Sequence, residues 1–161
     1  CPVLEKILES GEDLYCAIWK ELTGQDCNEH YRDICKRIFL PVVYGASAKS
    51  LCERIPKMSE STAEQMIRRI YIRFPVAMNW VKEQQDNVGE NCIASDYFER
   101  KRHFDGDFYR VRNFSIQSPA ALICLHKLVK LHQTLEDFEL GHMAYHVHDG
   151  YMVRTTDSIL V

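Results

Sequence analysis

The stretch from Tyr31 to Gly45, YRDICKRIFLPVVYG, is the part of the sequence on which the interpretation of the fold depends. A long side chain recurs in it at every fourth position, at Arg32, Lys36, Leu40 and Tyr44. On an α-helix such positions lie along one slowly turning face. A guanidinium and an ammonium one turn apart can take neighbouring groups of a triphosphate. The alternative is a solvated basic face on a helix with an apolar end, and this stretch alone leaves both open.

The composition restricts the class of protein. The chain has 161 residues, of which 46% are hydrophobic, and a formal net charge of -3. This is enough to bury the core of one domain, so we expect a folded chain. The sequence contains neither a run of about 18 apolar residues nor a charged start followed by an apolar segment, so we expect no membrane span and no signal peptide. With a negative net charge, contacts to nucleic acid must come from local basic patches.

Seven cysteines lie at positions 1, 16, 27, 35, 52, 92 and 124, without a C-x-x-C pair. We interpret them as reduced, mostly buried thiols of a reducing compartment, and not as a zinc site or a disulfide framework. His146 and His148 alternate onto one side of a predicted strand, but a closed zinc site needs further ligands. The expected location is therefore the cytoplasm, or the host cytoplasm for a viral protein.

Capping residues and apolar spacing predict the first helices. Asp13 is expected to cap a helix over residues 14–22 that ends at Gly24. Asp26 and Glu29 have capping-box spacing for the helix over Tyr31–Gly45, and Ser61 and Glu64 for a helix that continues to Phe74. Pro41 removes a backbone donor, so a kink is expected between Arg37 and Pro41. Pro75 fits the first turn of the next helix.

The second half of the chain is predicted to contain a basic hairpin, a long helix and two strands. Residues 91–112 are expected to form short strands around the Asp105–Gly106 turn. Its cations and aromatic rings can follow a nucleic-acid backbone, although a solvated surface is the alternative. From Ser118 a helix should run to about Phe138, followed by strands near 144–147 and 151–155. The residues expected to face the core from this helix are Ala121, Leu122, Leu125, Leu128, Val129 and Leu135.

Three motifs in order resemble those of family A DNA polymerases, the DNA polymerase I and phage replicase type. Arg32, Lys36 and Tyr44-Gly45 have the R-x3-K-x7-YG spacing of motif B, the nucleotide-binding helix of the fingers. NFSIQ, with Asn113 and Gln117, resembles the N-x3-Q of a long palm helix, and His148-Asp149 resembles the HDE of motif C. GEDLYCAIWKELTG is similar to the G-x-D-I-H helix that precedes motif B, and IYIRFPVAMNWV to the F-x-x-YP-x-V segment. The resemblance covers nearly the whole chain.

The resemblance implies an α+β fold, predominantly α, made of the fingers and the C-terminal part of the palm of a right-hand polymerase. Residues 1–112 would be the fingers, with the basic hairpin near 91–112. Residues 113–161 would be the partial palm, with short antiparallel strands that carry motif C. The implied activity is template-directed DNA synthesis, and the implied partners are primer-template DNA and dNTP. A viral or phage-like source is suggested by QS-x-x-ALI, and a processivity factor is left unassigned.

The resemblance also implies roles for single residues of motif B. Arg32 would hold the γ-phosphate, and Lys36 would hold the inner phosphates and could protonate pyrophosphate. Leu40 would face the incoming sugar and base, where the family usually has Phe or Tyr. Tyr44 and Gly45 would lie beside the templating base.

Further roles follow for the second half of the chain. Asn113 and Gln117 would meet primer and template in the minor groove, and His148 would contact the primer-terminal phosphate. Arg100 and Arg102 of the basic hairpin would follow the DNA backbone. Glu99 stands where the family has a glycine before its arginines, so we expect the local backbone to differ.

Catalysis is expected to depend on Asp149. Two Mg²⁺ ions roughly 3.5 to 4 Å apart need bridging carboxylates, and Asp149 is the candidate in this sequence. The second aspartate, that of motif A, is expected upstream of Cys1. Asp96 in DYFERK lacks the small residue of motif A and follows motif B, so we reject it for that role. Gly150 replaces the usual motif C glutamate.

Two other interpretations remain at this point. A single-subunit RNA polymerase shares motif B and an HD motif, although Gln117 in its QS-x-x-A context resembles the DNA enzymes. A non-catalytic helical nucleic-acid-binding module would show no magnesium-dependent nucleotide binding. We therefore expect a DNA-directed DNA polymerase, with these two as alternatives.

Overall fold

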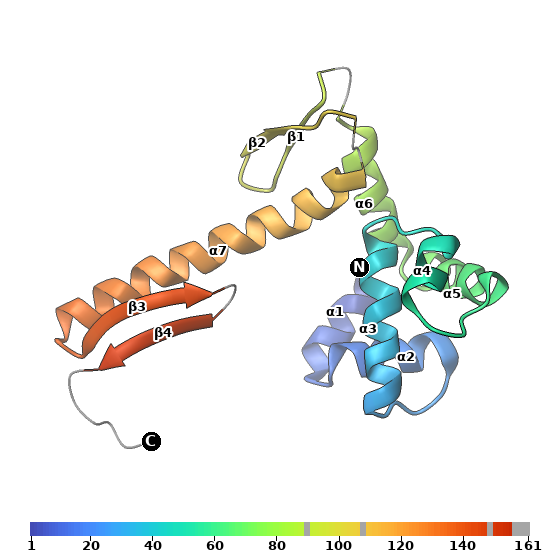
Figure 1. Ribbon diagram of the computed structural model, residues 1–161, viewed down its shortest axis with the longest axis horizontal. Helices are drawn as coiled ribbons and strands as arrows, with labels where there is room; N and C mark the ends of the chain where they lie inside the picture. The colour runs from blue at the N-terminus through green and yellow to red at the C-terminus, as the bar shows by residue number, and fades with distance from the viewer. Residues whose placement is uncertain (89–90, 107–108, 148–149, 156–161) are drawn as a thin grey trace.

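The computed structural model describes residues 1–88, 91–106, 109–147 and 150–155. Figure 1 shows the first helices gathered at one end, with one long helix running away from them and a hairpin lying along its far half. The elements, in chain order, are α1 Pro2–Ser10, α2 Leu14–Thr23, α3 Glu29–Val43, α4 Ala48–Arg54, α5 Glu60–Arg73, α6 Pro75–Asp86, β1 Ile93–Ser95, β2 Lys101–His103, α7 Tyr109–Asp137, β3 Gly141–Val147 and β4 Gly150–Thr155. The chain is thus predominantly α with two short antiparallel strand pairs, which confirms the predicted α+β class.

The predicted helix over 14–22 is confirmed together with its caps. Asp13 accepts hydrogen bonds from the backbone N–H groups of Tyr15 and Cys16, and Gly24 ends α2 in a left-handed conformation. The side-chain carboxylate satisfies two of the amides that the first turn leaves without partners. This cap fixes Asp13 at the start of α2, which matters for the site described below.

Both predicted capping boxes are wrong. Asn28, and not Asp26, caps α3, through a hydrogen bond of 2.9 Å from Tyr31 N–H to Asn28 Oδ1. Ser59, and not Ser61, caps α5 by accepting from Thr62 N–H. In each case another residue of the favoured N-cap type stands two positions from the predicted one, and the spacing of residues does not decide between them.

The helix predicted over Tyr31–Gly45 is α3, Glu29–Val43, which runs through Pro41. It begins two residues earlier than predicted, and Tyr44 is its C-cap. Gly45 follows with φ of 92°, a conformation that glycine adopts without strain. The kink near Pro41 stays a prediction.

The main hydrophobic core lies among α1–α6. Its fully buried side chains include Ile18 of α2, Ile38 of α3, Leu51 of α4, Ile70 of α5, and Phe74, which follows α5. A smaller cluster of Val88, Ala94, Phe104 and Val111 joins the end of α6, β1–β2 and the start of α7. Two separate cores hold the two walls of the cleft described below.

The hairpin predicted around Asp105–Gly106 is placed differently in the structure. β1 pairs with β2, Ser95 opposite Lys101, so the chain reverses over residues 96–100. Asp105 and Gly106 instead follow β2 and precede the described start of α7 at Tyr109. The basic residues are therefore divided among the β1–β2 turn, β2 and the first turns of α7. The predicted division between residues 112 and 113 falls inside this helix.

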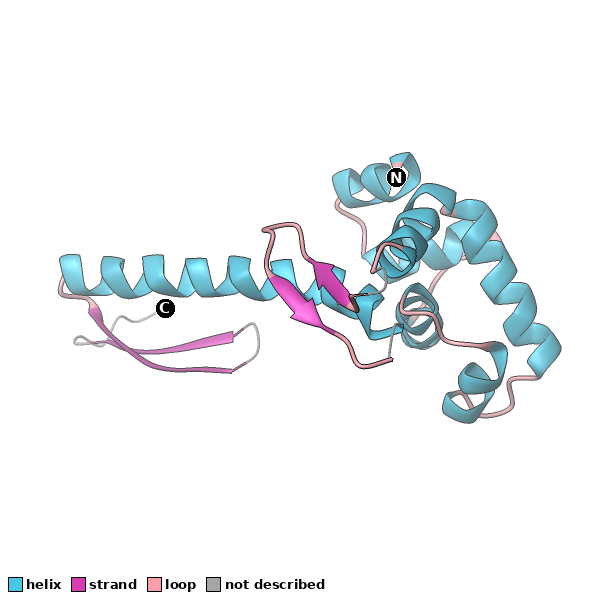
Figure 2. Ribbon diagram, turned by 90° about the horizontal axis from the view of Figure 1, so that it is seen from above, coloured by secondary structure: helices cyan, strands magenta, loops and turns pink. Residues whose placement is uncertain are grey.

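α7 begins nine residues before Ser118 and includes Pro119. Of its predicted core residues, Leu135 is buried and Leu122 and Leu128 are half-buried, whereas Ala121, Leu125 and Val129 are exposed. The prediction of a continuous buried side is therefore wrong for the second half of the helix. Figure 2 shows the physical reason, since this half projects from the helical body and, of the described strands and helices, only β3 and β4 lie beside it.

The last two strands are confirmed. β3 and β4 are antiparallel, from Gly141 opposite Thr155 to Val147 opposite Gly150, with an irregularity between Met143 and Tyr145. Tyr151 ties this hairpin to α7 by donating a hydrogen bond of 2.8 Å to the carbonyl of Cys124.

The cysteines correct one expectation. Cys16 of α2 and Cys27 of the segment before α3 form a disulfide, so the expectation that every thiol is reduced is wrong for this pair. Spacing did not reveal it, because the two residues are 11 positions apart and meet only through the packing of α2 against α3. The other five cysteines form no disulfide among the described residues. Within the described ranges no helix is long and apolar enough to cross a bilayer.

Candidate nucleic-acid cleft

A cleft of about 940 Å³ lies between the end of α3, α4, β2 and the first turns of α7. It brings together six residues that the sequence nominated from three separate segments: Leu40, Tyr44, Gly45, Arg102, Asn113 and Gln117. The lining also contains Arg54, Arg110, Pro41, Ala46, Ser47, Ser50, Phe114 and Ser118. The described lining thus has three guanidinium groups and no carboxylate, and it is suited to an anionic ligand.

One direct contact joins the two walls of the cleft. Gln117 of α7 donates a hydrogen bond of 3.0 Å from Nε2 to Tyr44 Oη at the end of α3. The residues are 73 positions apart in the sequence. Tyr44 is half-buried and Gln117 is exposed, so this contact can open at low cost when a ligand enters.

Gly45 is fixed by its backbone conformation and by a close neighbour. A Cβ at this position would lie 3.0 Å from an Nη atom of Arg112, and its φ of 92° disfavours other residues. Arg112 is itself held by a hydrogen bond of 2.8 Å from its Nε to Gln85 of α6. The α3–α4 turn therefore fits closely against α7, and glycine permits this approach.

The α4 wall was missed by the analysis of the sequence. Ser47, Ser50 and Arg54 all line the cleft, and their spacing of three and four places them on one face of a helix. That spacing was a signal that could have been used. Arg54 also accepts a hydrogen bond at its carbonyl from the side chain of Arg37, which joins the end of α4 to α3.

Arg32 and Lys36 lie together but outside the cleft lining. Both cations face the ring of Tyr15, with Arg32 Cζ at 5.6 Å and Lys36 Nζ at 5.9 Å from the ring centroid. Arg32 also pairs with Asp13, Nε to Oδ2, at 2.8 Å. Tyr15 was not nominated, although it occupies the histidine position of the G-x-D-I-H resemblance. The row of Arg32, Lys36, Leu40 and Tyr44 along α3 therefore begins beside α2 and ends in the cleft.

Charge pairing differs between the two cations. The hydrogen bond from Arg32 lowers the pKa of Asp13, and Asp13 in turn raises the pKa of Arg32. Burial is the main cause that raises the pKa of Tyr15, so its hydroxyl is neutral at pH 7 and can donate a hydrogen bond. Lys36 is exposed and has no ion pair within the described part of the chain. Lys36 is thus the more available of the two for a phosphate.

Arg102 and Arg100 have different surroundings, although they stand two positions apart. Arg102 lines the cleft, with its guanidinium carbon 5.3 Å from the ring centroid of the buried Phe104. Arg100 is held by Asp96 and Ser118 and does not line the cleft.

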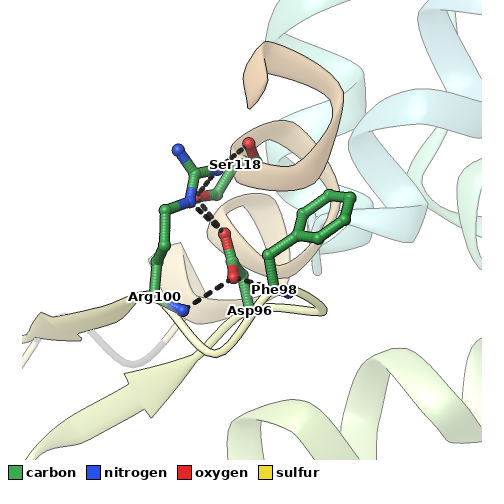
Figure 3. A network of polar contacts seen from close by, with 4 residues as sticks. All are labelled: Asp96, Phe98, Arg100 and Ser118. Atoms are coloured by element: carbon green, nitrogen blue, oxygen red, sulfur yellow. Dashed lines mark hydrogen bonds and ion pairs between the residues drawn. The ribbon is translucent and has the colours of Figure 1, made fainter. Parts of the chain in front are cut away.

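Asp96 organises the turn between β1 and β2, as Figure 3 shows. Its Oδ1 accepts from the backbone N–H of Phe98 at 2.9 Å and of Arg100 at 3.0 Å. Its Oδ2 accepts from Arg100 Nε at 2.9 Å and from Ser118 Oγ at 2.6 Å. Burial alone would raise the pKa of this carboxyl, but the hydrogen bonds from Ser118, Arg100 and Phe98 outweigh it and lower the pKa to about 2. Asp96 is therefore ionised in the folded protein at neutral pH.

Glu99 occupies the same turn and has a backbone conformation that glycine favours. Its φ is 61°, in the left-handed region, where a side chain costs energy. The family glycine that Glu99 replaces would adopt this conformation without that cost. The turn thus keeps a glycine-like backbone at a residue that is not glycine.

His148 and Asp149 lie outside the described residues, between β3 and β4 in the sequence. Among the residues that are described, no three of His, Cys, Asp and Glu lie together as a metal site would require. The assignment of the metal to Asp149 therefore stays a prediction.

The family model that matches this chain is one of DNA polymerases, and the similar proteins named here are all DNA polymerases. The family model described as DNA polymerase family A matches residues 2–160. The chain is similar to the DNA polymerase of Bacillus phage SP01, at 23% identity over 94% of this chain and 18% of that protein. It is also similar to DNA polymerase I of Helicobacter pylori, at 28% identity over 59% of this chain and 10% of that protein. It resembles DNA polymerase theta of Caenorhabditis elegans at 27% identity, over 76% of this chain and 8% of that one.

A solved structure has the same fold. The polymerase domain of Pol1 from M. smegmatis, in complex with DNA primer-template and dNTP, superposes with a TM-score of 0.87 at 19% identity. The match covers 97% of this chain and 30% of that chain. The chain thus spans less than a fifth of the length of the curated relatives and under a third of the solved chain.

Proposed function

The chain belongs to DNA polymerase family A, and on this premise we propose that it supplies the fingers and part of the palm for template-directed DNA synthesis. The reaction would transfer a nucleotidyl group from dNTP to a primer 3′-hydroxyl. The observation that carries the proposal is the cleft, which joins the motif B residues Tyr44 and Gly45 to Asn113 and Gln117 of α7. These two segments match separate polymerase motifs, and only the fold brings them together.

The lining of the cleft supports DNA as its ligand. Arg54, Arg102 and Arg110 supply positive charge, and no described lining residue carries a carboxylate that would repel phosphates. Tyr44 and Phe114 add aromatic rings on which a base can stack. The structurally similar Pol1 domain was solved with primer-template and dNTP bound. We therefore assign primer-template to the cleft.

The nucleotide would bind along α3. Lys36, whose ammonium is free of ion pairs within the described residues, would hold the inner phosphates. Arg32 would hold the γ-phosphate while it keeps its contact with Asp13, since a guanidinium has five N–H donors and the pair with Asp13 is made through Nε. Leu40, which lines the cleft, would pack against the sugar and base. Along α3, the residues that bind the triphosphate would thus come first, then Leu40 beside the sugar, and then Tyr44 beside the templating base.

Catalysis would need Asp149. A carboxylate oxygen is the donor type that Mg²⁺ takes, so this residue fits the ion by its chemistry. When bound, two such ions supply the charge that favours attack by the primer 3′-hydroxyl and departure of pyrophosphate. The described residues would bind and orient the substrates, and Lys36 would stand beside the leaving phosphates.

The test compares two glutamines on the same helix. Gln117→Ala removes the amide that would bind DNA in the cleft, whereas Gln133→Ala removes the amide of an exposed glutamine farther along α7. In the complete polypeptide that contains this chain, we expect Gln117→Ala to weaken primer-template binding about tenfold, the value of one hydrogen bond in a desolvated site. Gln133→Ala should leave it unchanged. Equal effects, measured by fluorescence anisotropy with labelled primer-template, would argue against DNA in the cleft.

A further inference from the structure

The carboxylate of Asp96 is buried, ionised and unused by the function proposed above. Its side chain has no exposed surface, and all four of its hydrogen bonds are to the β1–β2 turn or to Ser118 of α7. A buried charge is costly unless it is fully paired. The hydrogen bonds of Asp96 favour its ionised form and outweigh desolvation, and they also fix the relative positions of the groups that they join.

The geometry joins the hairpin to α7 beside the cleft. Arg100 donates from Nη2 to Ser118 Oγ at 2.8 Å and also to the Ser118 carbonyl. Ser118 lines the cleft directly after Gln117. Asp96 accepts from both Arg100 and Ser118, so it locks the two side chains to each other. The contact therefore fixes the distance between the hairpin and the helix that carries Asn113 and Gln117.

The same contact sets the position of Arg102. Arg100 directly precedes β2, and its carbonyl accepts a hydrogen bond of 2.9 Å from the backbone N–H of Asp96, so fixing Arg100 against α7 also fixes the start of the strand that carries Arg102. Arg102 lines the cleft together with Asn113 and Gln117, and its guanidinium packs on Phe104. Strand pairing alone is weak here, because β1 and β2 have three residues each. The side-chain network therefore adds to the apolar cluster of Ala94, Phe104 and Val111 in holding this short hairpin against α7.

We propose that Asp96 is a positioning residue for the DNA-binding cleft: it holds Arg100 on Ser118 and thereby places Arg102 for a DNA phosphate. Arg100 then acts through the network and is not itself a DNA ligand. This inference rests on the proposed function, because it names how one wall of the same cleft is held. It makes a prediction opposite in sign to that of simple electrostatics.

The direction in which Asp96→Asn changes the affinity for DNA tests this proposal. Asp96→Asn removes a negative charge near a polyanion and releases Arg100, so electrostatics alone would tighten DNA binding. If Asp96 is a positioning residue, the same change should weaken binding of primer-template at least threefold. Asp105→Asn is the matched control, since it removes an exposed carboxylate that follows β2 and should leave binding unchanged or tighter. The measurement is the Kd of the complete polypeptide for primer-template, below the melting temperature of each variant.

A double-mutant cycle separates positioning from a general loss of structure. Arg102→Gln should weaken binding. It should also reduce, by about one, the steepness with which the log of the DNA-binding constant falls with the log of the salt concentration. In the Arg102→Gln background, Asp96→Asn should have little further effect, because it acts through Arg102. Ser118→Ala, which keeps the carboxylate and removes one anchor, should weaken binding in the same direction as Asp96→Asn.

The outcomes are distinguishable. Unchanged or tighter binding by Asp96→Asn, or an effect that adds fully to that of Arg102→Gln, would overturn the inference and leave the proposed function intact. Failure of the wild-type polypeptide to bind primer-template would overturn the proposed function, and the inference with it.

Discussion

Lys36 and Arg32 show how two cations on one helix can have different tasks. Asp13 pairs with Arg32 through Oδ2 and caps α2 through Oδ1, so the partner of Arg32 is itself fixed at the start of α2. The ammonium of Lys36 lies 5.9 Å from the centroid of the Tyr15 ring and has no ion pair within the described residues. An ammonium against an aromatic face is held loosely and can turn toward a phosphate.

Substitution of Lys36 tests this assignment. In the complete polypeptide we expect Lys36→Ala to lower kcat/KM for dNTP incorporation about 10- to 100-fold, the value of a hydrogen bond to a charged group. Lys20→Ala, on the exposed side of α2, is the matched control and should have little effect. Single-nucleotide extension at saturating primer-template measures both. Small effects of similar size would remove Lys36 from the nucleotide site.

Glu99 carries backbone strain at a position where the resemblance places a glycine. Because glycine populates the left-handed region freely, the φ of 61° at Glu99 predicts that Glu99→Gly raises the free energy of unfolding. The expected gain is roughly 0.5 to 1 kcal/mol, after allowance for the greater entropy that glycine gives the unfolded chain. Glu64→Gly, in the middle of α5, should instead destabilise by about 1 kcal/mol. Thermal unfolding of the complete polypeptide should therefore shift in opposite directions. A lower melting temperature for Glu99→Gly would contradict the strain.

At the scale of elements, the β1–β2 turn depends on a charged carboxylate. The pKa of Asp96 is about 2 in the folded protein, below the value of about 3.9 for an unperturbed aspartate. Its contribution to stability is therefore fully present above about pH 4 and is lost as the pH falls toward 2.

The pH dependence of local opening checks this element. Hydrogen-exchange protection of the Phe98 and Arg100 amides, corrected for intrinsic exchange, should fall between about pH 4 and pH 2 in the wild type. The fall should be much smaller in Asp96→Asn, which starts from lower protection and has no carboxyl to titrate. Asp105→Asn should behave as the wild type does. The same pH profile in wild type and Asp96→Asn would show that the network does not hold the turn.

Elements with strong local signals were predicted from the sequence, and those decided by distant contacts were not. Asp13, Gly24 and Pro75 mark helix ends through their own chemistry, and the structure confirms them. The hairpin was misplaced because Asp105–Gly106 is a strong local turn signal, whereas the actual turn is stabilised by Ser118, 22 residues from Asp96. The Cys16–Cys27 disulfide was missed for a similar reason.

At the scale of the whole molecule, four residues to which the resemblance gives roles lie together, whereas Arg32 and Lys36 lie outside the cleft lining. Leu40, Tyr44, Asn113 and Gln117 belong to motifs that are far apart in the chain, and they line one cleft. Periodicity could not have predicted this, because it gives the face of a helix and not its neighbour. The same limit explains α7, whose apolar stripe was read as core while Leu125 and Val129 are exposed in this chain.

We propose that these elements form the substrate-binding part of a DNA polymerase whose chemistry depends on Asp149. Carboxylates that hold catalytic magnesium contribute several kcal/mol to transition-state stabilisation. Their loss therefore lowers the rate by a factor on the order of a thousand. Asp137→Asn, at the exposed end of α7, is a control that keeps the same change of charge.

The most direct measurement is primer extension by the complete polypeptide with magnesium and all four dNTPs. We expect template-directed extension by the wild type and by Asp137→Asn, and a loss on the order of a thousandfold in Asp149→Asn. Full activity of Asp149→Asn, or no template-directed extension by the wild type, would contradict this account.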